Sequence, residues 1–283
     1  MTQLPGVTSN PLKPSGRELS VGPVYSESQF DQEIRALQSP DFYHSNMVEF
    51  IQNAPPQLTK VRPFPRPIDR LIIGATADHK MAVQADWLHG EFLSDLILYG
   101  KDSGPALLGI ASGEIFLNRD NPERRMVIFT YNPDPWYYVT KLFGRDNNAV
   151  KLADLRDNID MDGKFQYLAK LLSSAHPDEH ALSDDWDGKS LILVIDQIDR
   201  VFQQFPAIQK ILGNWPRDTR GMTTLLASAE TQFGSMMNPS LNIARKVADP
   251  LIFAVPLVDG DTTRLMPFRV YPPVDIGMPL LTQ

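Results

Sequence analysis

Short apolar runs alternate with longer amphipathic segments over most of the chain. The apolar runs are residues 70–73, 125–130, 190–195, 222–227, 250–255 and 267–271. Segments with helical spacing lie between them, at residues 81–99, 150–175 and 200–212. Because a run such as LILVI at 191–195 has no polar face, it predicts a strand that is buried on both sides of a sheet. Strands that alternate with helices predict an α/β fold with a mostly parallel central sheet flanked by helices.

The N-terminal part of the chain differs in composition and lacks this alternation of strands and helices. Residues 1–23 are rich in Pro, Gly and Ser and lack periodicity, which is typical of a tail. Two short amphipathic helices are predicted, one from Ser26 with Gln29 in the capping-box position, and one over residues 45–53. The proline-rich stretch 55–67 cannot continue a helix.

We therefore predict an N-terminal helical and Pro-rich extension over residues 1–66 and one α/β domain over residues 67–283. The extension either docks a partner or packs back on the domain. Residues 107–117 are interpreted as a further strand or a hairpin.

The charge and composition of the chain exclude several classes of function. The formal net charge of −7 argues against an extended non-specific nucleic-acid surface. The chain has 0 cysteines, which excludes disulfides, iron–sulfur clusters and thiolate zinc sites. No apolar run approaches the roughly 20 residues of a membrane span, and residues 1–12 lack the features of a secretory signal. We expect a cytoplasmic protein.

The most informative segment reads LILVIDQID, over residues 191–199. A buried parallel strand that ends in Asp196 would deliver a carboxylate to the edge of the sheet where ligands bind, and there hold a water of a Mg²⁺ shell. The next residue, Gln197, stands where a glutamate would activate the attacking water, and an amide cannot accept that proton. Loss of such a base costs about 10²–10⁴ in rate. The alternative is a strand that simply ends in an acidic turn residue.

A second segment reads LIIGATADHKM, over residues 71–81. Gly74 and Lys80 stand at the first-glycine and lysine positions of the phosphate-binding pattern G-x-x-x-x-G-K-[ST]. A β-rich run precedes the segment and a helical run is predicted after it. Gly74, Ala75, Thr76 and Lys80 are therefore candidate nucleotide-binding residues.

Two residues of this segment depart from the pattern, and a third is unfavourable for phosphate binding. His79 replaces the second glycine, whose small size lets the backbone wrap phosphates. Met81 replaces the Ser or Thr, and a thioether is a poor ligand for Mg²⁺. Asp78 adds a negative charge where phosphates would dock. The alternative is an ordinary strand–turn–helix connection with a surface lysine.

A third segment reads RDTRGMTTLLAS, over residues 217–228. Ser228 ends a predicted strand and is a candidate polar sensor of a γ-phosphate. Arg217 and Arg220 are candidate trans-acting residues that reach a neighbouring subunit's nucleotide. The alternative for both arginines is a solvated helix C-terminus, where cations are favourable.

Two further segments carry weaker signals. One segment contains His176, Asp178, Glu179 and His180, which indicate either a metal-binding cluster or a solvated loop. Residues 132–138, NPDPWYY, indicate either a nucleobase or partner surface or a turn that packs on the domain.

The segments LIIGATADHK, MVIFTYNPD, LILVIDQID and RGMTTLLAS together resemble FtsK/HerA-type motor ATPases. The resemblance covers roughly residues 68–271 and implies a RecA-like P-loop NTPase fold, assembly into rings or larger machines, and work on DNA or on secreted protein. It implies ATP and Mg²⁺ as cofactors if hydrolysis is retained, and none if it is lost. The chain departs from the family at His79, Met81, Gln197 and Ala229, all nucleotide-handling positions.

Three hypotheses follow. The first is an inactive or impaired pseudo-ATPase that serves as an oligomeric structural or regulatory subunit among the other subunits of a secretion, conjugation or DNA-translocation machine. The second is an active Mg²⁺–ATP motor with an atypical loop, in which Lys80 contacts the phosphates. The third is an unrelated α/β enzyme or binding protein. Side-by-side positions of Gly74 and Asp196 at the carboxyl edge of the sheet would separate the first two from the third.

Overall fold

The computed structural model describes residues 27–40, 72–78, 81–83, 95–118, 124–143, 150–173, 190–215, 223–231, 241–259 and 262–270. Within these ranges, ten strands form one sheet in the order β2-β1-β10-β9-β8-β3-β7-β6-β4-β5. The strands are β1 (Ile72–Thr76), β2 (Met81–Val83), β3 (Asp95–Tyr99), β4 (Arg124–Thr130), β5 (Val150–Asp154), β6 (Ser190–Ile195), β7 (Thr223–Ala229), β8 (Ile243–Ala248), β9 (Ile252–Asp259) and β10 (Thr262–Arg269). The helices are α1 (Glu27–Gln38), α4 (Ser103–Asn118), α5 (Pro133–Phe143), α6 (Met161–Ser173), α7 (Ile198–Gln204) and α8 (Pro206–Gly213).

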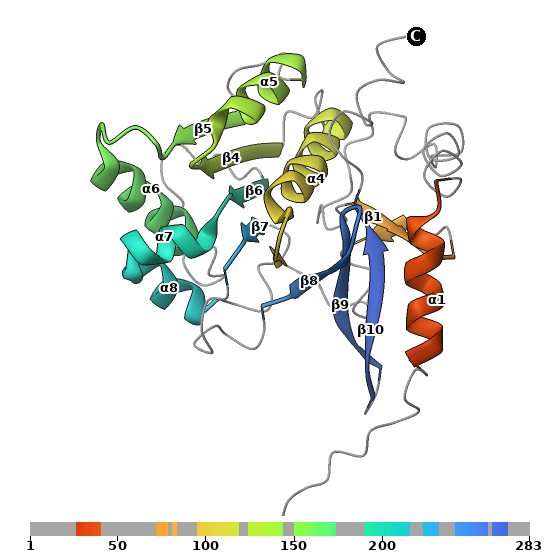
Figure 1. The fold of residues 1–283 in the computed structure, drawn as a ribbon. Helices are drawn as coiled ribbons and strands as arrows, with labels where there is room; N and C mark the ends of the chain where they lie inside the picture. The colour runs from red at the N-terminus through yellow and green to blue at the C-terminus, as the bar shows by residue number, and fades with distance from the viewer. Residues whose placement is uncertain are drawn as a thin grey trace, which may run out of the picture.

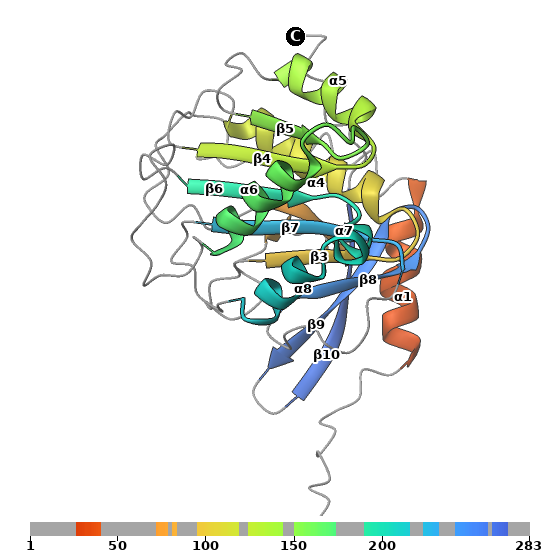
Figure 2. The same cartoon turned by 90° about the vertical axis from the view of Figure 1, so that its left-hand side faces the viewer.

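The part of the sheet from β8 to β5 is parallel throughout. Helix α4 connects β3 to β4, α5 connects β4 to β5, α6 connects β5 to β6, and α7 and α8 lie between β6 and β7. Figure 2 shows these strands one above another, with α6, α7 and α8 in front of the sheet and α4 behind it. The prediction of an α/β fold with a mostly parallel central sheet flanked by helices is confirmed.

Helices cover both faces of the parallel strands, which explains the continuous apolar runs. On β6, Ile192 and Val194 belong to the core cluster that contains residues of α4 and α5. Their neighbours Leu191, Leu193 and Ile195 belong to the cluster that contains residues of α6, α7 and α8. Because successive side chains of a strand point to opposite faces, every position of such a strand must be apolar.

Strands β9, β10, β1 and β2 form an antiparallel extension of the sheet beyond β8. Helix α1 packs against it, as Figure 1 shows beside β10. Leu37 of α1 is fully buried with Ala75 and Ile252, and Arg269 donates a hydrogen bond to the Leu37 carbonyl. The helix predicted from Ser26 is thus present as α1 and packs on the sheet. The tail 1–23, the predicted helix over 45–53 and the proline-rich stretch lie outside the described residues.

Two stretches predicted as helices contain strands instead. Within residues 81–99 the described parts are the strands β2 and β3, and the segment 150–175 begins with β5 before α6 starts at Met161. The helical expectation failed at β3 because its first four residues, Asp95–Leu98, are all buried in the sheet. The run therefore has no exposed face from which a period of two could be read.

Residues 107–117, interpreted above as a strand or a hairpin, lie inside helix α4. That interpretation was wrong because α4 is buried along most of its length, with Ala106, Leu107, Ile110 and Ala111 among its core residues. A helix that is apolar on nearly all sides has no amphipathic period. The helix predicted over 200–212 is divided into α7 and α8 at Pro206, which stands at the first position of α8. None of the described helices is long and apolar enough to cross a membrane.

Candidate functional site

The candidate site lies where the parallel strands end. Helices α4 and α5 follow the strands β3 and β4 and pack on one face of the sheet. Strand β6 lies between β3 and β4 in the sheet, and the helix that follows it, α7, packs on the other face. In open α/β sheets, ligands bind outside the carboxyl ends of the strands at such a switch.

Asp196 is the first residue after β6, and its carboxylate is buried at this edge, with 5% of the residue exposed. Ser228 of β7 donates a hydrogen bond to its Oδ1 over 2.6 Å, and Thr130 of β4 donates to its Oδ2 over 2.8 Å. Each carboxylate oxygen thus accepts a hydroxyl hydrogen from a neighbouring strand. The arrangement ties β4, β6 and β7 together at their carboxyl ends.

The residues that follow Asp196 extend these contacts. Gln197 has a left-handed backbone (φ 61°), and its amide donates to the Ser228 hydroxyl over 2.9 Å. Asp199, which is 8% exposed, accepts hydrogen bonds from the amide and the hydroxyl of Thr231. Both acids of the DQID segment therefore hold the end of β7. The structure brings the predicted residues Asp196, Gln197 and Ser228 together; their roles toward a nucleotide remain predictions.

The loop between β3 and α4 borders the same carboxylate. It consists of Gly100, Lys101 and Asp102. The Gly100 amide and the Ser103 hydroxyl both donate to the Ala229 carbonyl, over 2.9 and 3.1 Å. A Cβ atom placed on Gly104 would lie 3.3 Å from Oδ1 of Asp196. The strand–loop–helix unit that faces Asp196 is therefore β3–α4.

The strand–turn–helix unit expected from the segment 71–81 and the helical run after it is not formed. The strand β1 is followed by the antiparallel strand β2, with Gly74 opposite Ala82, and no helix follows directly. The strands β10, β9, β8, β3 and β7 separate β1 from β6. The chain of pairings from β8 through β9 and β10 also makes β1 run opposite to β6. Gly74, Ala75 and Thr76 are thus separated from Asp196 by five strands of the sheet, and their roles toward a nucleotide remain predictions.

Gly74 has a structural reason to be glycine. A Cβ atom at this position would lie 2.2 Å from the carbonyl oxygen of Arg269 on β10, where only a glycine fits. Thr76 donates its hydroxyl to the Asp78 carboxylate. His79 and Lys80 lie outside the described residues, as do Arg217, Arg220 and the cluster of residues 176–180.

The β3–α4 unit was missed in the sequence, although it carries a signal. The apolar run of β3 is followed by Gly100 and Gly104, with Pro105 in the first turn of a helix. It departs from the phosphate-binding pattern in two ways. Three residues separate its glycines where the pattern has four, and Pro105 and Ala106 stand where Lys and Ser or Thr would follow.

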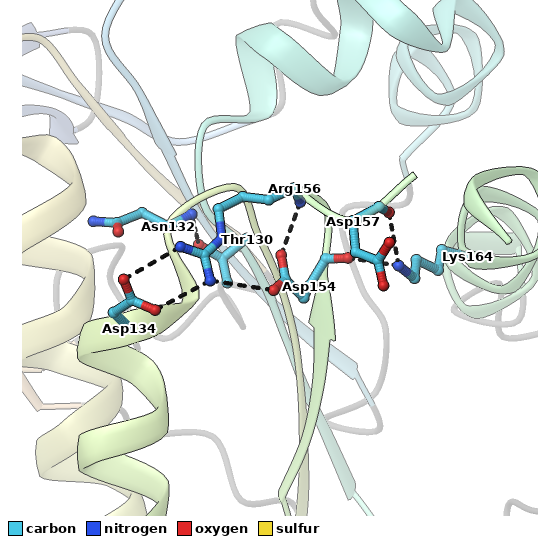
Figure 3. A network of polar contacts seen from close by, with 7 residues as sticks. All are labelled: Thr130, Asn132, Asp134, Asp154, Arg156, Asp157 and Lys164. Atoms are coloured by element: carbon cyan, nitrogen blue, oxygen red, sulfur yellow. Dashed lines mark hydrogen bonds and ion pairs between the residues drawn. The ribbon is translucent and has the colours of Figure 1, made fainter. Parts of the chain in front are cut away.

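A second polar network lies at the carboxyl ends of β4 and β5 (Figure 3). Arg156 makes a two-pronged contact with Asp134 of α5, at 3.2 and 3.1 Å, and a third contact of 3.4 Å with Asp154. Lys164 of α6 donates to the carbonyl oxygens of Asp154 and Asp157. Burial acts to raise the pKa of Asp154, but the hydrogen bonds from Arg156 outweigh it and lower that pKa. Since the Arg156 side chain is 45% exposed, this network contributes little to the free energy of unfolding.

The aromatic segment 132–138 forms the start of α5 rather than an isolated turn. Trp136 is 2% exposed and packs in the core, whereas Tyr137 and Tyr138 are exposed. In the described part of the chain, no group of three or more His, Cys, Asp or Glu side chains is arranged to hold a metal ion.

No protein-family model matches the chain, and a search of curated proteins also finds no match. Solved structures are similar. The cytoplasmic domain of the Thermomonospora curvata type VII secretion ATPase EccC matches with a TM-score of 0.53 and 14% identity, over 75% of this chain and 29% of that chain. ATPases 2 and 3 of the same EccC, in complex with a signal sequence peptide, match with a TM-score of 0.48 and 12% identity, over 74% and 42%. ATPases 2 and 3 of EssC from Geobacillus thermodenitrificans match with a TM-score of 0.48 and 12% identity, over 80% and 50%.

The chain thus spans less than a third of the EccC cytoplasmic domain. At this low identity the similarity concerns the fold. The α/β fold of this chain matches that of P-loop ATPases, and it is structurally similar to secretion ATPase domains.

Proposed function

We propose that this chain is a P-loop ATPase-like domain without effective ATP hydrolysis, which serves as a structural or regulatory component of a secretion or DNA-translocation machine in the cytoplasm. The observation that best supports this proposal is that both oxygens of the Asp196 carboxylate already accept hydrogen bonds from the protein. One accepts from the Ser228 hydroxyl and the other from the Thr130 hydroxyl. Because a carboxylate oxygen accepts about two hydrogen bonds, each oxygen of Asp196 has about one acceptor position left for a water of a Mg²⁺ shell.

The loop beside Asp196 supports the same conclusion. Phosphate binding relies on backbone amides of a wide loop, a lysine and a metal-binding hydroxyl. The β3–α4 loop has three residues, and Pro105 and Ala106 supply neither an ammonium group nor a hydroxyl. The buried Ser103 hydroxyl donates to the Ala229 carbonyl. The Ser103 hydroxyl is therefore bound within the protein.

The role within a machine rests on the resemblance to secretion ATPase domains. The EccC domain that shares the fold is named for type VII secretion, and this chain matches only a part of it. We extend that setting to this chain, whose partners would be the other subunits or domains of such a machine. Figure 1 shows helix α1 and the β9–β10 hairpin on the side away from α6, α7 and α8.

The other two hypotheses are less well supported. An active motor with its phosphates at Gly74 and Lys80 would need Gly74 near Asp196, and the sheet order separates them. By the criterion set in the sequence analysis, the separation of Gly74 from Asp196 favours coincidence for the phosphate-loop likeness of residues 71–81. The fold that the chain shares with a secretion ATPase domain is what favours the first hypothesis over an unrelated α/β protein.

Titration with a fluorescent ATP analogue in the presence of Mg²⁺, together with a phosphate-release assay, tests the proposal. We expect no saturable binding at micromolar concentrations and no turnover above that of an Asp196→Asn variant. An active P-loop ATPase in the same assay provides the positive control. Micromolar binding with turnover that Asp196→Asn abolishes would refute the proposal.

A further inference from the structure

The loop between β3 and α4 is held in a tight and locally strained conformation. Gly100 has φ 111° and Asp102 has φ 63°, and left-handed backbone is unfavourable for a residue with a side chain, although aspartate tolerates it better than most. The amide of Ser103 donates to the Gly100 carbonyl and the amide of Ala106 donates to the Asp102 carbonyl. Helix α4 thus begins directly after a single turn.

A lysine from another strand reaches this loop. The ammonium group of Lys246, on β8, lies 3.1 Å from Oδ2 of Asp102 and 3.5 Å from the carbonyl oxygen of Lys101. Only 11% of the Lys246 side chain is exposed. Its stem runs directly beneath the loop, since a Cβ atom on Gly100 would lie 2.9 Å from Cβ of Lys246.

Two further groups lie close to the Lys246 ammonium group. Asp249 provides a second carboxylate at 2.9 Å, and the ring of Phe253 lies 5.8 Å from the ammonium nitrogen. The two carboxylates differ in exposure: the side chain of Asp102 is 36% exposed and that of Asp249 is 77% exposed. Because a partly buried ion pair is screened less by solvent, the contact with Asp102 is the stronger constraint.

We propose that Lys246 is a latch that holds the β3–α4 loop in its closed conformation beside Asp196. The loop carries its own anion, Asp102, and β8 supplies the matching cation. This inference rests on the proposed function and deepens it, because a loop that is bound to its own sheet cannot widen around phosphates. Loss of the latch would release the loop while the sheet beneath it stays intact.

Four substitutions separate the latch from general stability. Lys246→Met removes the charge and keeps the apolar stem over Phe253, and Lys246→Arg keeps the charge. Asp102→Asn removes only the charge of the loop carboxylate, since asparagine also tolerates a left-handed backbone. Asp249→Asn is the matched control, because it removes the other carboxylate of the same lysine.

The test is hydrogen–deuterium exchange of the full chain, read on peptides that cover residues 100–106. In Lys246→Met and Asp102→Asn we expect the amides of Ser103 and Ala106 to exchange about tenfold faster, a factor that corresponds to about 1.4 kcal/mol of lost protection. Exchange at this loop should stay close to that of the original protein in Lys246→Arg and Asp249→Asn. Peptides from β4 and α6 should be unchanged.

Unchanged loop exchange in both Lys246→Met and Asp102→Asn overturns the latch, and so does an equal increase in Asp249→Asn. If Lys246→Met raises exchange throughout the protein, the loop variant Asp102→Asn decides. This outcome is independent of the nucleotide assay: ATP turnover by the original protein refutes the proposed function whatever the exchange result, and a failed latch with no ATP binding leaves the proposed function standing.

Discussion

Replacement of Asp95 by asparagine tests a buried carboxyl group at the amino ends of the parallel strands, away from the candidate site at their carboxyl ends. Asp95 is the first residue of β3 and is 2% exposed. Burial raises the pKa of Asp95 to about 7 from its ordinary 3.8, although hydrogen bonds from the amide and the side chain of Asn242 act in the other direction. The group is therefore protonated in the folded protein at a pH where it is ionised in the unfolded chain.

The sign of the effect on stability follows from this difference. Between pH 3.8 and about 7 the folded state binds the proton and the unfolded state has lost it, so the free energy of unfolding falls as the pH rises through this window. Each unit of pKa difference changes the free energy of unfolding by about 1.4 kcal/mol. The interval from about pH 5 to the folded pKa of about 7 spans about two of these units. Asp95 alone should therefore lower the free energy of unfolding by about 2–3 kcal/mol between about pH 5 and about pH 8.

Urea unfolding of the original protein and of Asp95→Asn at these two pH values measures the effect. Asparagine resembles the protonated acid, so the variant should be similar to the original protein at the lower pH and more stable at the higher pH. The difference between the two proteins isolates Asp95 from other titrating groups. A difference that does not change with pH would refute the reasoning, since it would mean that Asp95 ionises equally in the folded and unfolded states.

Two further substitutions test the packing described above. Ser228→Ala removes the hydroxyl that donates to Asp196 and accepts from the Gln197 amide. The substitution should lower the free energy of unfolding, measured with urea, by about 1–3 kcal/mol because buried polar partners are left without a hydrogen bond. An unchanged urea midpoint would contradict the role of Ser228 in holding the Asp196 carboxylate. Gly74→Ala places a Cβ atom against the backbone of β10 and should cost about 1–3 kcal/mol in thermal unfolding. Gly213→Ala is its control, because nothing lies within 4 Å of the added atom, and equal effects at both glycines would disprove the steric explanation.

The strands that could be predicted from the sequence are those whose own residues form a recognisable pattern. The runs at β4 and β6 were predicted close to their observed bounds because both combine continuous apolar residues with polar flanks. The strands β3 and β5 were read as parts of helices. Buried positions on both faces hide the period of two in β3, and β5 is half-buried and five residues long.

The candidate site shows the same division. The order of residues along the chain is sufficient to place Asp196 after a buried strand and Ser228 near the end of the next, because the pattern of each strand is local. Only the tertiary structure decides which strand–loop–helix unit lies beside Asp196, since this depends on the pairing of Leu96 with Leu226 across β3 and β7, far apart in the sequence. A Gly-Ala-Thr sequence at residues 74–76 is locally compatible with a phosphate loop and with a tight strand pair, and the close approach of β10 selects the second.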